Sequence, residues 1–466
     1  MKTIFPKFSI GDYEEKRIKL GISPVEVFMR LYPHFETVFL LESLGEDGKY
    51  NRYSYIGFEP LFTVSALGNE LIVNSKKHTI HNPYDLLKSL CTGQDAQKGF
   101  CGGLVGYISH EGTKYFEPAF VGYTNKLFPD FEFGFYLDGL KYDKETQRLI
   151  YFHHGNSRLA QVQSILNEKE TIGDFDFEKK GVSHTETEYR KMLETAHEHL
   201  RAGDVFQVVL SLKTYYKMTG DLRKVYSVLR EVNPSPNMYF FKFGKRQIIS
   251  ASPELLIQVK GKQLEHFGTL AGTIRRGKDK KEDQKLADQL VADEKERAEH
   301  MMLVDLARND VGKICEFGSV YVDKLLTVKK YSHVQHIYSE VRGILKKPEN
   351  SFSALAACFP AGTLTGAPKI EAIKIIYQLE KESRGPYGGV GGYFSLSGDS
   401  MFAIAIRSLF VCGNEAFTQT GSGIVIDSTF QKEYQEIKNK QAAMEMTLIK
   451  AKGAFVETTA TRERLI

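Results

Sequence analysis

The chain has 466 residues, of which 42% are hydrophobic and 26% charged, and both values are ordinary for a globular protein. This length predicts a large core, arranged as two domains or as one interleaved unit. The formal net charge of +4 argues against a nucleic-acid or membrane-surface role, and no stretch approaches the ~20 apolar residues of a spanning helix.

The amino terminus, MKTIFPKFSI, lacks the apolar core of a signal peptide, so the cytoplasm is the expected location. The cysteines show no C-x-x-C spacing and are Cys91, Cys101, Cys315, Cys358 and Cys412. They therefore indicate neither a disulfide framework nor a zinc site, and buried thiols are the simpler interpretation.

Residues 1–180 are rich in predicted strands. Apolar or aromatic runs bounded by Gly, Asn and Asp cover Val38–Ser43, Arg52–Phe58, Leu71–Ser75 and Arg148–His154, with a glycine-rich strand or turn at Cys101–Ser109. Gln161–Glu170 is a helical candidate, whereas the polar segment Thr171–Ser183 shows no periodicity and is predicted to be a linker. We therefore expect an N-terminal domain over 1–180 and a second domain over 181–466.

The second part mixes helices with strands. Helices are predicted from Glu186 to near Gly203, over Asp293–Asp310 and after the glycine-rich loop in Pro360–Glu380. Strands are predicted over Asp204–Met218, Asn233–Phe243 and Ile249–Val259, and Gly268–Gly277 is predicted to be a loop. Because strands arrive in series rather than alternating with helices, the pattern favours an α+β fold with antiparallel sheets.

Two pairs of carboxylates lie at i and i+3 on predicted helices. Glu296 and Glu299 open one helix, and Glu433 and Glu436 lie near the C-terminus. Each pair would share one side of its helix, and carboxylates carried inward are costly unless a cation meets them. Two such pairs could converge on Mg²⁺, although either pair alone is more simply a solvated helix face.

The segment GTLTGAPK resembles a phosphate-binding loop but lacks its register, since Pro368 precedes the lysine and Ile370 follows it. A nucleotide site is therefore not expected. A glycine loop that opens a helix still suits an anion such as a carboxylate.

Seven motifs follow one another in order: FQVVLS (Phe206–Ser211), ASPELL (Ala251–Leu256), LAGTIRRG (Leu270–Gly277), ERAEHMMLVDLARND, PAGTLTGAPK, AIAIRS (Ala403–Ser408) and TGSGIV (Thr420–Val425). From about Tyr189 to Met446 they resemble the chorismate-utilizing enzymes, and FLLES with RYSYIG extends the resemblance toward the N-terminus. The anthranilate synthase component I group of that family is the most similar.

This resemblance implies large antiparallel sheets packed as a sandwich, with helices on the outer faces. It also implies an Mg²⁺-dependent lyase that converts chorismate and ammonia, through aminodeoxyisochorismate, to anthranilate and pyruvate. That reaction is the first committed step of tryptophan biosynthesis.

The resemblance makes Glu299 and Glu436 direct metal ligands, with Glu296 and Glu433 close by. It gives substrate-binding positions at Gly272, Thr273, Thr363, Tyr387, Arg407, Gly421, Ser422 and Gly423. Arg407 could fork onto the enolpyruvyl carboxylate. Without the motifs, Arg407 and Tyr387 would be interpreted as a surface cation and a sheet aromatic.

Four positions bear on the chemistry. Gln207 lies where isochorismate- and salicylate-forming relatives carry a lysine that activates water, and a neutral amide suits ammonia as the nucleophile. Ala271 replaces the lysine that attacks covalently in typical aminodeoxychorismate synthases. Glu254 matches the acid that protonates the departing C4 hydroxyl, and His336 matches a histidine tied to the loss of pyruvate.

Six positions match a tryptophan feedback site: Glu42, Ser43, Lys49, Pro236, Asn237 and Met238. Asn237 stands where the family usually has tyrosine, so inhibition is expected to be weaker or altered, unless the site is only structural.

No glutaminase Cys–His pair is visible, so a separate glutamine amidotransferase subunit, component II, is expected to deliver the ammonia. Two alternatives remain open from the sequence. One is aminodeoxychorismate synthase component I, which forms 4-amino-4-deoxychorismate for folate. The other is a catalytically silent tryptophan-binding subunit, against which the intact carboxylates and His336 argue.

Overall fold

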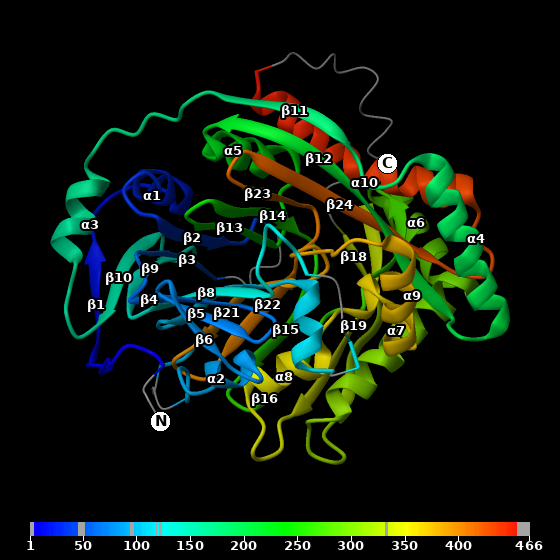
Figure 1. Cartoon of the computed structure of the whole chain (residues 1–466), viewed down its shortest axis with the longest axis horizontal. Coiled ribbons are helices and arrows are strands. Elements are labelled where there is room, and N and C mark those ends of the chain that lie inside the picture. Colours follow the sequence, from blue (N-terminus) through cyan, green and yellow to red (C-terminus); the bar gives the residue numbers. More distant parts are fainter. Residues whose placement is uncertain are drawn as a thin grey trace.

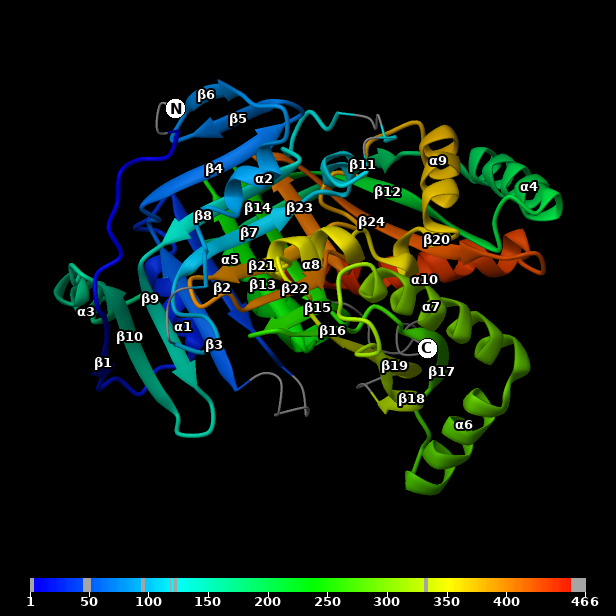
Figure 2. The same ribbon diagram turned by 90° about the horizontal axis from the view of Figure 1, so that it is seen from below.

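The computed structural model describes residues 4–44, 52–93, 97–117, 119–120, 124–330 and 334–453. These residues form two twelve-stranded sheets, and every pair of neighbouring strands is antiparallel. Helices lie around the outside of the two sheets (Figures 1 and 2). The predicted α+β sandwich of antiparallel sheets is confirmed.

The first sheet runs in the spatial order β1 (Tyr13–Ile18), β10 (Arg148–His154), β9 (Asp138–Asp143), β3 (Tyr53–Phe58), β2 (Thr37–Glu42), β13 (Asn237–Phe243), β14 (Arg246–Ser252), β23 (Ser408–Cys412), β24 (Glu415–Ile424), β12 (Gln207–Gly220) and β11 (Phe175–Val182), with β20 (Gly366–Ala367) pairing with β12. The second sheet runs in the order β17 (Ala271–Arg275), β19 (Val334–Ile344), β16 (Gln263–His266), β15 (Leu255–Lys260), β22 (Ser400–Ile404), β21 (Val390–Ser395), β7 (Gly103–Ile108), β8 (Phe131–Tyr136), β4 (Phe62–Leu67), β5 (Glu70–Val73) and β6 (Lys76–Thr79), with β18 (Tyr321–Lys330) pairing with β19.

The helices are α1 (Pro24–Leu31), α2 (Pro83–Leu87), α3 (Leu159–Leu166), α4 (Glu186–Ala202), α5 (Leu222–Val232), α6 (Lys280–Ala292), α7 (Glu294–Gly312), α8 (Ser351–Cys358), α9 (Lys369–Glu380) and α10 (Phe430–Ala451), with 3₁₀ turns η1 (His110–Tyr115) and η2 (Gly362–Leu364). Helix α4 begins where Thr185 and Glu188 form a capping box and ends at Gly203 in the left-handed conformation, so its predicted limits are confirmed.

The main core lies between the two sheets, and β13 shows how it is built. Tyr239 and Phe241 point toward the second sheet, while Met238 and Phe240 pack under the outer helices. A Cβ on Gly391 in β21 would lie only 2.8 Å from atoms of both Tyr239 and Phe241. A glycine there lets the aromatic rings of one sheet approach the backbone of the other.

The predicted linker Thr171–Ser183 is wrong, because its residues Phe175–Val182 form the edge strand β11. Only one side of β11 pairs, with β12, and most of its side chains are exposed, so the segment carries no apolar alternation. Each sheet contains strands from both sides of residue 180. The predicted parts 1–180 and 181–466 therefore share both sheets.

Two further expectations need correction. The predicted loop Gly268–Gly277 contains the strand β17, and the helix α6 that follows it was not predicted. The predicted strand pair Ile249–Val259 is two strands, but β14 belongs to the first sheet and β15 to the second. The chain thus passes between the sheets at Pro253 and Glu254.

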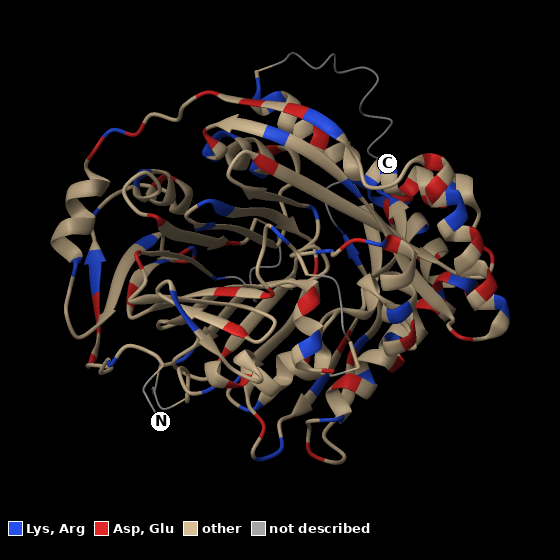
Figure 3. Cartoon of the chain, viewed as in Figure 1, with Lys and Arg blue, Asp and Glu red and all other residues tan. Residues whose placement is uncertain are grey.

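Acidic and basic side chains are interspersed along the outer helices, with no extended face of one sign in the view of Figure 3. This distribution follows from the nearly balanced count of 62 basic and 58 acidic residues. Among the described residues, no helix combines the length and apolar content needed to cross a membrane.

Candidate active site

Three of the predicted site residues lie on the neighbouring strands β12 and β24, with Gln207 on β12 and Gly421 and Gly423 on β24. In the register of these strands Val209 faces Gly423 and Ser211 faces Gly421. Gln207 begins β12, and a Cβ on Gly423 would lie 2.6 Å from its Nε2. Gly423 is therefore needed as glycine, because a side chain there would displace the amide of Gln207.

Gln207 is 3% exposed and joins the strand to the predicted metal residues. Its Nε2 donates a hydrogen bond of 2.6 Å to Oε1 of Glu299. Its Oε1 is buried and has no hydrogen-bond partner among the described residues. A buried amide oxygen without a donor costs free energy, which a bound N–H group would offset.

Helix α7 carries Glu296 and Glu299 in its first turns. The side chain of Asp293 caps this helix by accepting from the backbone N–H groups of Lys295 and Glu296. Burial raises the pKa of Glu299, and burial together with the charge of Glu299 raises the pKa of Glu296. The negative charge of Glu436 on α10 also acts on both carboxyls.

These carboxylates offer only oxygen donors, which is the chemistry that Mg²⁺ prefers. Crowded acids with raised pKa values also indicate a place where a cation would relieve repulsion. Within the part of the chain that the structure describes, however, no three His, Cys, Asp or Glu side chains come close enough together to hold a metal ion. The donor chemistry fits Mg²⁺, and the side chains would have to draw together around it.

Lys440 is a site residue that the sequence analysis missed. Its Nζ lies 2.6 Å from Oε1 of Glu436 and donates a 2.9 Å hydrogen bond to the carbonyl of Gly421. The side chain of Glu436 is 47% exposed, so its carboxylate is in contact with solvent and is oriented by the pair with Lys440. The i, i+4 spacing of Glu436 and Lys440 on a predicted helix was the available signal.

Glu254 lies in the connection from β14 to β15, at the passage between the sheets. It is 6% exposed, and burial raises the pKa of its carboxyl to about 8. The hydroxyl of Thr363 in η2 donates a 3.0 Å hydrogen bond to its Oε1. The two predicted residues are thus in contact, and Glu254 is protonated near neutral pH, as a general acid must be.

His336 on β19 faces the strand β17. Its Nδ1 lies 2.7 Å from the carbonyl of Gly272 and 3.1 Å from the hydroxyl of Thr273. Since a carbonyl only accepts, Nδ1 carries the proton and Nε2 is the basic nitrogen. Burial lowers the pKa of His336 to about 4, so the ring is neutral at pH 7.

The backbone of Gly272 fits this corner of the site. Its φ is +64°, a conformation that favours glycine, and a Cβ would lie 2.8 Å from Oε2 of Glu296. Ala271 precedes it in β17 and is 9% exposed. β17 therefore places Gly272 between His336 and the carboxylates of α7.

Arg407 lies in the passage from β22 back to β23, with φ at +51°. A non-glycine residue at positive φ costs free energy and is a frequent feature of binding sites. No hydrogen bond or ion pair of its guanidinium is found among the described residues, which leaves its fork available for an anion. Burial lowers its pKa, and the charges of Tyr387 and Glu436 act against that shift.

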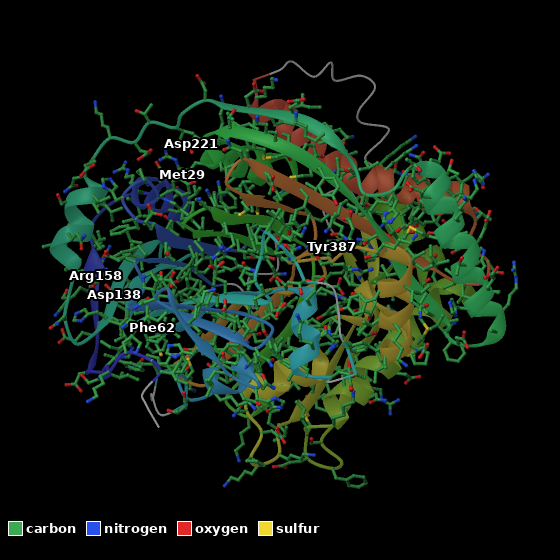
Figure 4. All side chains as sticks on the ribbon, in the orientation of Figure 1. Met29, Phe62, Asp138, Arg158, Asp221 and Tyr387 are labelled. Carbon is green, nitrogen blue, oxygen red and sulfur yellow. The ribbon has the colours of Figure 1, made fainter. Side chains whose placement is uncertain are left out.

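Tyr387 is 2% exposed and lies in the interior of the molecule (Figure 4). A Cβ on Gly421 would lie 3.0 Å from its hydroxyl, so Tyr387 approaches the strand β24 at this glycine. The hydroxyl of Ser422 lies 3.1 Å from that of Tyr189 on α4. Tyr387 and Gly421 are therefore adjacent, whereas the side chain of Ser422 reaches toward α4.

A pocket lies between the two sheets. It is lined by five predicted positions, Glu42, Ser43, Pro236, Asn237 and Met238, and by aromatic residues that include Tyr53, Tyr55 and Tyr393. The sixth predicted position, Lys49, lies outside the described residues. The structure thus brings together two segments that are nearly 200 residues apart in sequence.

Residues that the sequence analysis did not find support this pocket. Glu42 accepts hydrogen bonds from the hydroxyl of Tyr226 at 2.7 Å and from Nε of Arg230 at 2.6 Å. Nζ of Lys144 donates to the carbonyl of Ser43 at 2.7 Å. These partners offset the cost of burying Glu42, and no short motif marks them.

Residues 36–446 match the family described as chorismate binding enzyme, and known proteins are similar to the chain over most of its length. Anthranilate synthase component 1 from Methanothermobacter thermautotrophicus is 43% identical over 425 residues, which cover 90% of this chain and 91% of that protein. Its counterpart from Leptospira biflexa is 42% identical over 464 residues, covering 97% of this chain and 100% of the other. The crystal structure of anthranilate synthase component I from Streptococcus pneumoniae matches with a TM-score of 0.75 at 32% identity and covers 94% of this chain and 99% of its own. The chain belongs to the chorismate-binding enzyme family.

Proposed function

We propose that the chain is the ammonia-using subunit of an anthranilate synthase, a lyase that converts chorismate and ammonia to anthranilate and pyruvate. The similarity to proteins named anthranilate synthase component 1 supports this proposal. The buried Gln207 carries it structurally, because its unpartnered Oε1 can accept an N–H from ammonia and cannot deprotonate water.

In the first step the nitrogen of ammonia forms a bond to C2 of chorismate. The ring double bonds shift, the bond from C4 to its hydroxyl breaks, and the protonated carboxyl of Glu254 donates the proton that lets the hydroxyl leave as water. The hydrogen bond from Thr363 holds Glu254 in place without removing that proton. The new ammonium group releases one proton and Glu254 takes one up again, which gives aminodeoxyisochorismate.

In the second step the ring loses the proton at C2 and the bond from C3 to the enolpyruvyl oxygen breaks. Pyruvate leaves as its enolate, which takes up a proton at its methylene carbon, and the ring becomes aromatic. The neutral imidazole of His336 takes the C2 proton on Nε2, while the hydrogen bond from Nδ1 to Gly272 stabilises the imidazolium that forms.

Two features suit a doubly negative substrate. Arg407 and the buried Tyr387 would hold the enolpyruvyl carboxylate, and the backbone of Gly421–Gly423 would lie along the ring. Glu299 and Glu436, with Glu296 and Glu433 beside them, would hold Mg²⁺ at the ring carboxylate. When bound, Mg²⁺ neutralises the substrate and ligand carboxylates and polarises the ring carboxylate.

Ammonia would come from a partner, the glutamine amidotransferase subunit. Hydrolysis of glutamine by such subunits needs a reactive thiolate, and four of the five cysteines are buried here. Burial raises the pKa of Cys91 to about 12 and that of Cys315 to about 11. The thiols of Cys91 and Cys315 therefore remain protonated, which also suits a reducing cytoplasm.

The pocket between the sheets would bind tryptophan as a feedback inhibitor. Its aromatic lining suits an indole ring, and Glu42 and Ser43 suit an amino acid backbone. Its residues Leu255 and Ala403 adjoin the passages that carry Glu254 and Arg407, so the occupied pocket would act on the catalytic residues.

One assay tests the proposal. The purified chain is incubated with chorismate, MgCl₂ and ammonium chloride, and anthranilate fluorescence is followed with and without EDTA. We expect fluorescence that grows with ammonium concentration and stops on chelation. A product that becomes aromatic only after a separate lyase is added would point to aminodeoxychorismate synthesis instead.

A further inference from the structure

Arg384 is the largest fully buried side chain of the described residues, with 1% of its surface exposed, and the reaction steps above do not use it. A buried guanidinium is costly unless its charge is paired and its five N–H donors find acceptors. The partners that this side chain reaches therefore show what the protein gains from keeping it.

The charge is paired with Glu380, at the end of α9. Nε of Arg384 donates to Oε2 of Glu380 at 2.9 Å, and Nη2 donates to Oε1 at 2.6 Å. Oε1 of Glu380 also accepts from the backbone N–H and the hydroxyl of Ser211, at 2.9 and 2.8 Å. The ion pair is thereby fixed to the middle of β12.

Two of the remaining three donors reach backbone carbonyls. Nη1 of Arg384 donates to the carbonyl of Leu364 at 2.6 Å, and Nη2 donates to the carbonyl of Val209 at 2.8 Å. Leu364 follows Thr363, the residue that holds Glu254. Val209 lies two residues after Gln207 on the same strand.

One planar group therefore joins the strand of Gln207 to the turn of Thr363. These are the two ends of the amination step, since ammonia is bound beside Gln207 and the leaving hydroxyl is protonated by Glu254. No hydrogen bond of Arg384 reaches β17 or β19 among the described residues. His336, which serves the elimination step, is held instead by the contacts of its Nδ1 with Gly272 and Thr273.

We infer that Arg384, paired with Glu380, is a positioning residue for the amination step, which sets the distance between the ammonia position at Gln207 and the acid Glu254. This inference rests on the function proposed above. Lysine could not replace it, because a single ammonium nitrogen cannot span a carboxylate and two carbonyls that lie on different sides of a planar fork.

The test separates the two steps. Amination is measured from chorismate at saturating substrate and ammonium, and elimination is measured from aminodeoxyisochorismate prepared with a His336→Met variant. Arg384→Lys and the milder Glu380→Gln are compared with the wild type. Saturation removes effects on substrate binding, and the ratio of the two rates does not depend on the fraction of folded enzyme.

Arg223→Lys is the matched control. Arg223 is also a buried arginine, 6% exposed, and pairs with Asp221 and Glu170. It lies just after β12, at the end of that strand opposite to Gln207. Its loss should lower stability and reduce both rates in the same proportion.

For Arg384→Lys we expect amination to fall by about 10²-fold, the usual cost of a small misplacement of reacting groups, while elimination falls no more than in the control. Glu380→Gln should also lower the ratio of the amination rate to the elimination rate. If Arg384→Lys does not fold, the result for Glu380→Gln alone tests the inference. Equal losses in both steps, or no loss in either, would overturn the inference. A wild type that forms no anthranilate would instead refute the proposed function.

Discussion

Replacing Glu254, the proposed catalytic acid, should make the protein more stable in alkali as well as less active. Glu254 is buried, and its carboxyl pKa rises from 4.5 to about 8 on folding, so the folded state favours the neutral acid. The unfolded chain ionises above pH 4.5, so the stabilisation is complete below that pH and is lost as the pH rises toward 8. A shift of this size corresponds to roughly 5 kcal/mol at pH 9.

Glutamine cannot ionise but can still accept the hydrogen bond from Thr363. Glu254→Gln should therefore match the wild type in free energy of unfolding near pH 4 and exceed it by up to roughly 5 kcal/mol at pH 9. Amination should fall by about 10²- to 10⁴-fold, the usual contribution of a general acid.

The assay is urea unfolding of both proteins at unit intervals from pH 4 to pH 9, together with the amination rate at pH 7. Glu231→Gln, at an exposed position near the end of α5, is the control and should follow the wild type at every pH. The reasoning would be refuted if the difference in free energy of unfolding between Glu254→Gln and the wild type stayed constant from pH 4 to pH 9. The carboxyl of Glu254 would then have the same pKa in the folded and the unfolded chain.

Four other changes test the remaining assignments. His336→Met should let aminodeoxyisochorismate accumulate while anthranilate falls, and unchanged anthranilate turnover by chromatography would remove its role. Gln207→Lys should divert the product from the amino to the hydroxy compound, because an amine can activate water, and mass spectrometry distinguishes the two. Glu299→Gln should weaken Mg²⁺ activation at least about tenfold, which a titration of rate against Mg²⁺ would show, provided that the unfolding midpoint is retained. Asn237→Tyr should strengthen inhibition by tryptophan through added aromatic contact, and an equal or higher half-inhibitory concentration would contradict this.

Local sequence signals predicted the helices of the site well. The capping residues of α4 and α7 are adjacent in sequence to the turns that they stabilise, so Thr185, Gly203 and Asp293 act where a short window can find them. The edge strand β11 escaped detection because pairing on one side leaves its residues polar. Its hydrogen bonds to β12 hold it in the extended conformation, and β12 lies too far along the sequence for a short window to contain both.

The convergence of the site had a different origin. Gln207 and His336 are placed by sheet pairings between segments that are distant in sequence, and only the order of motifs indicated that they belong to one site with Glu254. Arg384 and Lys440 carried no such mark, although Lys440 stands four residues after Glu436. The roles of Arg384 and Lys440 depend on which carbonyl or carboxylate groups their side chains contact, and only the tertiary structure determines these contacts.

The sharing of both sheets by early and late segments also constrains how the protein is made. β7, at residues 103–108, pairs with β21, which lies at residues 390–395. Likewise, β2 pairs with β13, which is synthesised much later. On the ribosome the N-terminal third therefore emerges with open hydrogen-bonding edges and an uncovered aromatic face long before its neighbours are synthesised. Such distant pairings slow folding, so nascent chains of this enzyme should depend on chaperones until the last strands have left the exit tunnel.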